Sequence, residues 1–268
     1  FNDYSGMQPT RFNAVWDIYY EELLIEVNSM ITDAQEDGYN HYVGIGQIQK
    51  AAALLDMTDW WGSIPYTSAA LGIEEVNPTF DSQESIYTEV FNLLASGSTN
   101  MALNDGGFPV RNDDVIYGGD TSKWIKVANA IKARAHLHLG QYAEALAAAK
   151  ASFTSQDDNM TYTFGITQQA GWWRFNDGRL GDIEFHPHLR GIMTGLNDTD
   201  RLGVWDVTFN TSHPYLKPNY TQAYISYREV QFIIAECLSR TNGSVAEMET
   251  AYLSGIKASF LESGLTEA

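Results

Sequence analysis

The sequence predicts an all-α, mainly helical fold in which helix hairpins form the scaffold and one long, irregular, loop-rich segment is inserted between them. Apolar side chains recur at steps of three and four residues in several long segments, as they do in helices that bury one face. Between residues 153 and 225 this period disappears, and Gly, Asn, Asp, Thr and aromatic residues replace it. With 268 residues, 44% of them hydrophobic, the chain can bury a core without disulfides or a metal.

The apolar stripes predict helices at residues 11–34, 41–60, 141–152, 226–240 and 244–262. Two more helices have recognisable starts. Asp81 can cap one of them, with Glu84 three residues later, and we expect it to fade between residues 97 and 104. Asp120 can cap the other, which Gly140 interrupts. Its inward, buried positions are predicted to be Trp124, Val127, Ala128, Ile131 and Ala135.

These elements predict a single domain over residues 1–268 with three parts. Residues 1–152 form the helical-repeat scaffold, 153–225 the irregular ligand-binding insert, and 226–268 a returning helical hairpin. Residues 61–80 contain Gly62, Pro65, Gly72 and Pro78, which cannot continue a helix, so this stretch is predicted to be an ordered loop.

Charge excludes several classes of function. The chain has 16 basic and 34 acidic side chains, a formal net charge of −18. A field of this sign repels phosphate backbones and anionic lipid headgroups, so neither nucleic acid nor a membrane surface is an expected partner. The lone Cys237 lies in an apolar run, which indicates a buried, inert thiol.

The strongest candidate binding segment is GWWRFNDG, residues 171–178, which we expect to be a loop bounded by glycines. Indole rings stack on the apolar C–H faces of sugars, while Arg, Asn and Asp bond the hydroxyls. Buried aromatic packing is the alternative. The candidate ligand-binding residues here are Trp172, Trp173, Arg174, Phe175 and Asp177.

A second aromatic and polar cluster, YNHY at residues 39–42, lies at the turn of the first hairpin and makes Tyr39 a further candidate. A solvated turn is the alternative interpretation. The opening residues, FNDYSG, add the candidates Asn2, Asp3 and Tyr4, with a frayed terminus as the alternative. The case for these three residues depends on the family resemblance described below.

Catalytic and metal sites have weak support. Asp157 with Asp158, or Asp198 with Asp200, supplies two carboxylates of the kind that glycoside hydrolysis needs, but solvated charge in polar loops is the better interpretation. The same runs can ligate calcium but lack the EF-hand pattern. Nucleophile-elbow, P-loop and dinucleotide-binding motifs do not occur. We therefore predict no enzyme and no cofactor, with calcium as a weakly supported exception.

Residues 140–145 (GQYAEA) resemble the start of the second helix of a tetratricopeptide repeat, and several hairpins of suitable length can be drawn. Three longer strings are more specific. Residues 59–67 (DWWGSIPYT), 120–134 (DTSKWIKVANAIKAR) and 226–236 (SYREVQFIIAE) resemble, in the same order, motifs of the SusD/RagB family, the surface glycan-binding lipoproteins of Bacteroidetes.

The resemblance implies a non-enzymatic protein that captures a polysaccharide or oligosaccharide and delivers it to a SusC-like TonB-dependent transporter. It implies a location on the extracellular face of the outer membrane, with the membrane contacted only through an N-terminal lipid anchor that this chain lacks. It also implies that the first-helix lead-in containing Asn2, Asp3 and Tyr4 contributes to the ligand pocket. The helical-repeat face would meet the transporter.

Three alternatives stay open at this stage: an all-α glycan-cleaving enzyme, a tetratricopeptide-type adaptor, and a peptide-binding member of the same family. The sequence departs from the family pattern at Ser63, where Asp is usual, and at Arg228, where Ala is usual. Family members are generally about twice this length. We therefore expect the chain to be incomplete.

Overall fold

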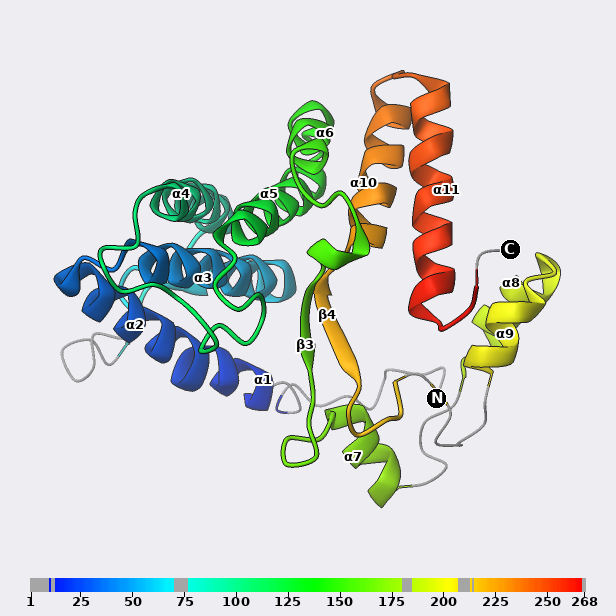
Figure 1. Ribbon diagram of the computed structural model, residues 1–268, viewed down its shortest axis with the longest axis horizontal. Helices are drawn as coiled ribbons and strands as arrows, with labels where there is room; N and C mark the ends of the chain where they lie inside the picture. Colours follow the sequence, from blue (N-terminus) through cyan, green and yellow to red (C-terminus); the bar gives the residue numbers. More distant parts are fainter. Residues whose placement is uncertain are drawn as a thin grey trace. The chain divides into compact units, whose positions relative to one another are not determined.

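The computed structural model describes residues 10, 13–69, 77–179, 185–206, 213 and 215–266. The chain divides into two compact units, Phe1–Gln141 and Tyr142–Ala268, and each is described by itself (Figure 1). The prediction that the whole chain forms one domain stays a prediction.

The first unit is helical. Its helical elements are α1 (Asn13–Asp17), the π-helical turn η2 (Ile18–Leu23), α2 (Leu24–Asp37), α3 (Asn40–Trp61), α4 (Gln83–Ala102) and α5 (Thr121–His138). The first three run without a break and correspond to the single helix predicted at residues 11–34. Gly38 ends α2 in the left-handed conformation, with φ of 77°, and its N–H bonds to the carbonyls of Ala34 and Gln35.

The core of the first unit lies around α3, which packs most extensively against α4 and also contacts α2 (Figure 1). Leu54, Leu55 and Met57 are completely buried. Gly44 on α3 and Gly97 on α4 allow the two backbones to approach closely, because a Cβ at Gly44 would lie 2.9 Å from the Gly97 carbonyl oxygen. The core positions predicted on α5 are confirmed as buried: Trp124, Val127, Ala128, Ile131 and Ala135.

The predicted cap of α4 is wrong. Ser82, one residue after Asp81, caps the helix by accepting a hydrogen bond from the N–H of Ser85 at 3.2 Å. Asp81 instead belongs to the strand β2 (Phe80–Asp81), which pairs with β1 (Ile64–Pro65). Its carboxylate accepts hydrogen bonds from the backbone N–H groups of Tyr66 at 2.9 Å and Thr67 at 2.8 Å. These bonds connect the end of the predicted loop to the residues that follow β1.

The predicted cap of α5 is confirmed. Asp120 precedes the helix in an extended conformation, and its Oδ1 accepts hydrogen bonds from the N–H groups of Ser122 at 3.0 Å and Lys123 at 3.3 Å. These bonds satisfy two donors that the first turn of a helix leaves open. The side-chain cap of Asp120 therefore explains why α5 starts where the sequence predicts.

The second unit contains a helical hairpin and a small sheet. Its elements are α6 (Tyr142–Lys150), the 3-10 turn η4 (Gln156–Asp158), β3 (Met160–Thr163), α7 (Gly171–Gly178), α8 (Pro187–Gly195), α9 (Thr199–Trp205), β4 (Thr221–Ile225), α10 (Tyr227–Arg240) and α11 (Val245–Glu262). The helices α10 and α11 form the predicted returning hairpin, capped by Ser226 and Ser244, and α6 packs against α10 (Figure 1).

The segment 153–225 is more regular than the sequence indicates. It contains the antiparallel pair β3 and β4 and the three helices α7, α8 and α9. These helices have 8, 9 and 7 residues. That is about two turns each, which is too short for a period of 3.6 residues to be recognised. In the part of the chain that the structure describes, no helix has both the length and the apolar character needed to cross a membrane.

Candidate ligand-binding site

A two-stranded ribbon positions the candidate site in the second unit. Strands β3 and β4 pair in antiparallel register from Met160 opposite Ile225 to Thr163 opposite Thr221. The ladder continues past the strands, because the N–H of Phe164 donates to the Tyr220 carbonyl at 3.0 Å. The helix α7 lies at the end of this ribbon away from α10 (Figure 1).

Ala170 attaches α7 to the ribbon. Its N–H donates to the carbonyl of Pro218 at 2.9 Å, and its side chain is buried. The next residue, Gly171, begins the helix, and the N–H of Arg174 closes the first turn on the Ala170 carbonyl at 3.0 Å. The start of α7 is therefore held beside the chain that enters β4.

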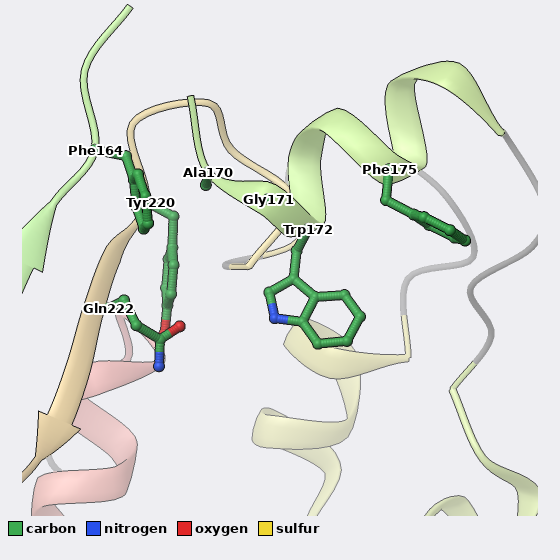
Figure 2. A pocket seen from close by; sticks show the side chains of 7 residues that line it. All are labelled: Phe164, Ala170, Gly171, Trp172, Phe175, Tyr220 and Gln222. Carbon is green, nitrogen blue, oxygen red and sulfur yellow. The ribbon is translucent and has the colours of Figure 1, made fainter. Parts of the chain in front are cut away.

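A pocket of about 440 Å³ lies between these segments (Figure 2). This volume is within the range of roughly 300–1,000 Å³ that is usual for small-molecule sites. Three segments contribute aromatic rings: the end of β3, the helix α7, and the approach to β4. The lining residues are Phe164, Ala170, Gly171, Trp172, Phe175, Tyr220 and Gln222.

The lining is aromatic and uncharged. Trp172 is 59% exposed and Phe175 is 42% exposed, so both rings are open to a ligand. Arg179 lies over the ring of Phe175, with 5.1 Å between the guanidinium carbon and the ring centroid. Gln222 provides the side-chain amide of the lining, and its Nε2 donates to the carbonyl of Ala223 at 3.0 Å.

Two aromatic rings that precede β4 in the chain hold Tyr220 in place. The ring of Tyr220 meets the ring of Tyr215 edge to face, with the ring centroids 4.8 Å apart. The ring of Tyr215 in turn packs against the ring of Trp205, with the centroids 4.7 Å apart. Burial is the main cause that raises the pKa of Tyr220 above its ordinary value, and the neighbouring Tyr215 adds to the effect. The phenol therefore stays neutral at physiological pH and presents a ring and a hydroxyl group.

The structure divides the predicted residues of the 171–178 segment into two groups. Trp172 and Phe175 line the pocket, whereas Trp173, Arg174 and Asp177 do not. The cause is that this segment is the helix α7 and not the predicted loop. Successive residues on a helix point about 100° apart, so residues at i and i+3 share a face and their neighbours do not.

The other predicted residues are not among those described as lining the pocket. Asn2, Asp3 and Tyr4 lie outside the described residues. Tyr39 belongs to the first unit, where its ring stacks on Phe108 with centroids 4.9 Å apart. Tyr42 lies beside this pair and donates its hydroxyl proton to Asp113. Tyr39 therefore supports the packing of a turn.

Sequence reasoning missed Phe164, Tyr220 and Gln222, although each lines the pocket. Phe164 and Tyr220 are joined only by the pairing of strands far apart in the sequence. The one local signal is that residues 220–225 are rich in Tyr, Thr and Ile, which favour a strand. Two strands of four and five residues do not identify their partners from sequence alone.

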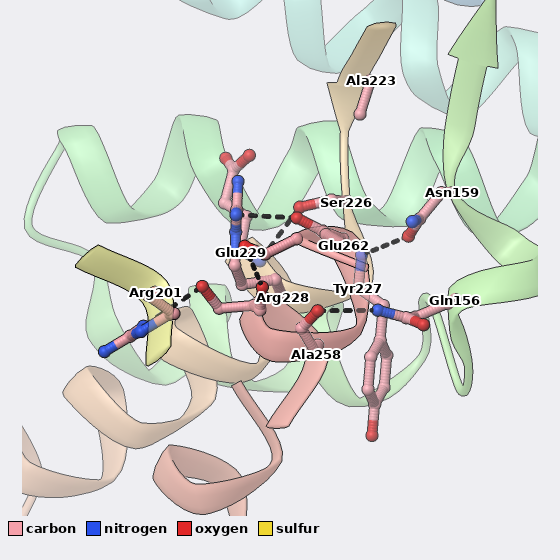
Figure 3. Close-up of polar contacts among 12 residues, drawn as sticks. Gln156, Asn159, Arg201, Ala223, Ser226, Tyr227, Arg228, Glu229, Ala258 and Glu262 are labelled. Atoms are coloured by element: carbon pink, nitrogen blue, oxygen red, sulfur yellow. Dashed lines mark hydrogen bonds and ion pairs between the residues drawn. The ribbon is translucent and has the colours of Figure 1, made fainter. Parts of the chain in front are cut away.

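A second pocket, of about 430 Å³, lies between η4, α10 and α11 and is lined by both polar and apolar side chains. Its residues are tied together across the unit: Gln156 Nε2 donates to the Ala258 carbonyl at 2.9 Å, and the N–H of Tyr227 donates to Asn159 Oδ1 at 2.6 Å (Figure 3). Arg228 and Glu262 form an ion pair at 2.7 Å nearby. These bonds join η4 to the hairpin of α10 and α11.

One carboxylate of each candidate catalytic or calcium-binding pair has structural contacts. Asp158 is buried and forms a capping box with Ser155, and its Oδ2 accepts a hydrogen bond from the N–H of Thr154 at 2.8 Å. Asp198 forms an ion pair with Arg201. Within the described ranges, no group of three or more His, Cys, Asp or Glu side chains is arranged to hold a metal ion.

Cys237 is buried, as predicted. Burial, with a smaller contribution from Glu236, raises the pKa of its thiol to about 11. The thiol is therefore protonated at neutral pH, which makes it a poor nucleophile.

Three solved structures with this fold are similar to the chain. A SusD/RagB family protein from Bacteroides thetaiotaomicron is 23% identical, with a TM-score of 0.76 over 94% of this chain and 62% of that one. A SusD homologue from Bacteroides vulgatus is 19% identical, with a TM-score of 0.80 over 97% and 60%. A chitin-binding SusD homologue from Flavobacterium johnsoniae is 18% identical, with a TM-score of 0.77 over 94% and 59%.

The chain thus spans about three fifths of the length of these solved structures. No curated protein matches it. The family model SusD-like, described as "Starch-binding associating with outer membrane", matches residues 2–211, well over half of the chain. Together with the helical fold, this match shows that the chain belongs to the SusD-like family.

Proposed function

We propose that the chain is a glycan-binding protein and that the pocket at α7 holds a sugar by ring stacking. The observation that carries the proposal is the convergence of Phe164, Trp172, Phe175 and Tyr220 on one open pocket without a charged lining residue among those described. Aromatic rings offer flat apolar faces that suit the C–H face of a neutral pyranose. Two structures of similar fold are named as chitin-binding proteins, which supports a glycan as the ligand class.

The protein is expected to bind and not to cleave its ligand. Glycoside hydrolysis uses two carboxyl groups on either side of the scissile bond. The residues described as lining the α7 pocket include no Asp or Glu. The role that follows for this pocket is retention of an intact glycan.

We place this activity at the outer membrane, on its extracellular face, where the protein would deliver the glycan to a SusC-like TonB-dependent transporter. The family description, which refers to association with the outer membrane, supports the location. A transporter gene beside the gene for this chain is the expected genomic arrangement. Co-purification of the two products would support the partnership, and a chain that never co-purifies with the neighbouring transporter would contradict it.

Affinity electrophoresis through gels that contain single polysaccharides tests the proposed binding. We expect slower migration in at least one gel of a panel that includes starch, chitin derivatives, mannan and xylan. The same polysaccharides, incubated with the protein, should yield no new reducing ends. Unchanged migration in every gel together with binding to a peptide library would favour the peptide-binding alternative, and new reducing ends would favour the enzyme.

A further inference from the structure

We propose that the α7 pocket recognises the acetamido group of an N-acetylated sugar. This selectivity rests on the proposed glycan binding at the same pocket and goes further, because it names the sugar substituent that the pocket recognises. The four aromatic rings and the Gln222 amide carry the inference.

The aromatic walls favour a ligand with a methyl group. Four of the seven residues described as lining the pocket are aromatic: Phe164, Trp172, Phe175 and Tyr220. A hexose with a hydroxyl group on each free ring carbon would place some of these hydroxyls against apolar walls, and an unpaired buried hydroxyl costs about 1–3 kcal/mol. An acetamido group replaces one hydroxyl by an apolar methyl end and a compact amide. The methyl end fits a ring-lined wall better than a hydroxyl does.

The polar groups of the lining match an amide. Gln222 uses its Nε2 to bond the Ala223 carbonyl, so its Oε1 is the atom that can accept a hydrogen bond from a ligand N–H. Figure 2 shows the indole nitrogen of Trp172 on the side of the ring that faces Tyr220 and Gln222. An indole N–H is a donor only and suits a ligand carbonyl. The pocket thus offers an acceptor and a donor on facing walls, complementary to the N–H and C=O of one acetamido group.

Related substituents fit less well. A free amine at the same carbon would, when protonated, need a carboxylate, which the residues described as lining the pocket do not supply. A uronic acid would need a cation, and Arg179, which lies over the ring of Phe175, is not among the lining residues. A 6-deoxy sugar brings a methyl group without an amide N–H, so the Gln222 Oε1 would gain no matched donor. The acetamido group is the substituent that uses both the rings and the amide.

Isothermal titration with three hexasaccharides of the same β-1,4 backbone tests the inference. They are chitohexaose, cellohexaose and the glucosamine hexamer, which carry an acetamido group, a hydroxyl group and an amine at the second carbon. We expect chitohexaose to bind about tenfold or more tightly than either of the others. The titrations should be run at 0.15 M salt or above, because the net charge of −18 attracts cationic ligands at low ionic strength.

Equal or tighter binding of cellohexaose, the glucosamine hexamer or a 6-deoxy-sugar oligomer would overturn the inference and leave the proposed glycan binding intact. The same holds if chitohexaose does not bind but another glycan of the electrophoresis panel does. A protein that binds no glycan at all would contradict the proposed function itself. The two failures are therefore distinguishable.

Two variants connect the selectivity to its residues. Gln222→Leu should reduce the ratio of chitohexaose to cellohexaose affinity at least about threefold, because it removes the acceptor. Trp172→Phe keeps a ring but removes the indole N–H, and should also lower the ratio. Trp173→Phe, on the same helix but outside the pocket lining, is the matched control. An unchanged ratio in Gln222→Leu, with a wild-type circular dichroism spectrum, would overturn the assignment of the amide.

Discussion

Trp172 on α7 and Tyr220, one residue before β4, line the same pocket, although 47 residues lie between them in the sequence. The bond from the Phe164 N–H to the Tyr220 carbonyl and the bond from the Ala170 N–H to the Pro218 carbonyl bring the two rings together. The pocket is therefore a product of the ribbon formed by β3 and β4, and its aromatic lining is not confined to the tryptophan-rich segment.

Tyr220→Ala should weaken glycan retention although Tyr220 lies outside α7. Removal of a ring that lines a binding pocket costs about 2 kcal/mol when that ring is central to recognition. Affinity electrophoresis against the retained polysaccharide measures the effect. Tyr252→Ala is the control, because Tyr252 is an exposed tyrosine on α11 that does not line the pocket. Equal retention of the two variants would contradict the role of Tyr220.

Gly106→Ala should destabilise the first unit more than Gly107→Ala does. Both glycines have positive φ, 71° and 87°, so both substitutions strain the backbone. A Cβ at Gly106 would lie 2.0 Å from the Gly38 carbonyl oxygen, whereas a Cβ at Gly107 would meet nothing within 4 Å. Thermal unfolding should show the lower midpoint for Gly106→Ala. Equal unfolding midpoints for the two variants would mean that the turn at Gly106 does not pack against the turn at Gly38.

Asp81→Asn should lower stability at neutral pH by about 1.5–3 kcal/mol, the usual value for hydrogen bonds to a charged group. Burial acts to raise the pKa of Asp81, but hydrogen bonds from Thr67 and Tyr66 outweigh it and lower the pKa below its ordinary value. The contribution of a carboxylate with a lowered pKa is present above its unfolded pKa of about 4 and is lost as the pH falls through its folded pKa.

Thermal unfolding of Asp81→Asn and wild type at pH 7 and near pH 3 measures this difference. The gap between their midpoints should shrink at the lower pH. Ser82→Ala, which removes the cap of α4 at the next position, should cost about 1 kcal/mol with no comparable dependence on pH. A gap for Asp81→Asn that stays constant over this range would argue against the ionised form of Asp81 as the stabilising group.

Cys237 should react slowly with Ellman's reagent at pH 8 in the folded protein. The side chain is completely buried, and its thiol has a pKa of about 11, so the reactive thiolate is both rare and inaccessible. In 6 M guanidinium chloride one thiol per chain should react within the mixing time. Fast, complete reaction of the native protein would show that α10 is not packed as the structure describes.

Long helices with a buried face could be predicted from sequence because many positions support each of them. The stripe on α5 identified five buried residues, and Asp120 gave its start. Asp81 looked like an equally good cap, but its carboxylate bonds to Tyr66 and Thr67 on the preceding loop. Asp and Ser are both favoured N-cap residues, so the sequence DS at residues 81–82 does not decide which of the two caps α4.

The pocket was only partly predictable. Trp172 and Phe175 were recognised from their residue types in a polar setting, but the eight-residue helix that separates them from Trp173 and Arg174 has too few turns to show a period. Phe164, Tyr220 and Gln222 reach the pocket through strand pairing, which depends on contacts between distant residues. The composition indicated the kind of site, and the tertiary fold determines its members.

The most direct test of the account is the affinity of Trp172→Ala and Trp173→Ala for the glycan that wild type binds, measured side by side by isothermal titration. The two tryptophans are adjacent on α7, but only Trp172 lines the pocket. We predict that Trp172→Ala loses about tenfold or more in affinity, or about 1.4 kcal/mol, and that Trp173→Ala stays within about twofold of wild type. The reverse order, or equal loss in both variants, would contradict the pocket at α7 as the ligand site.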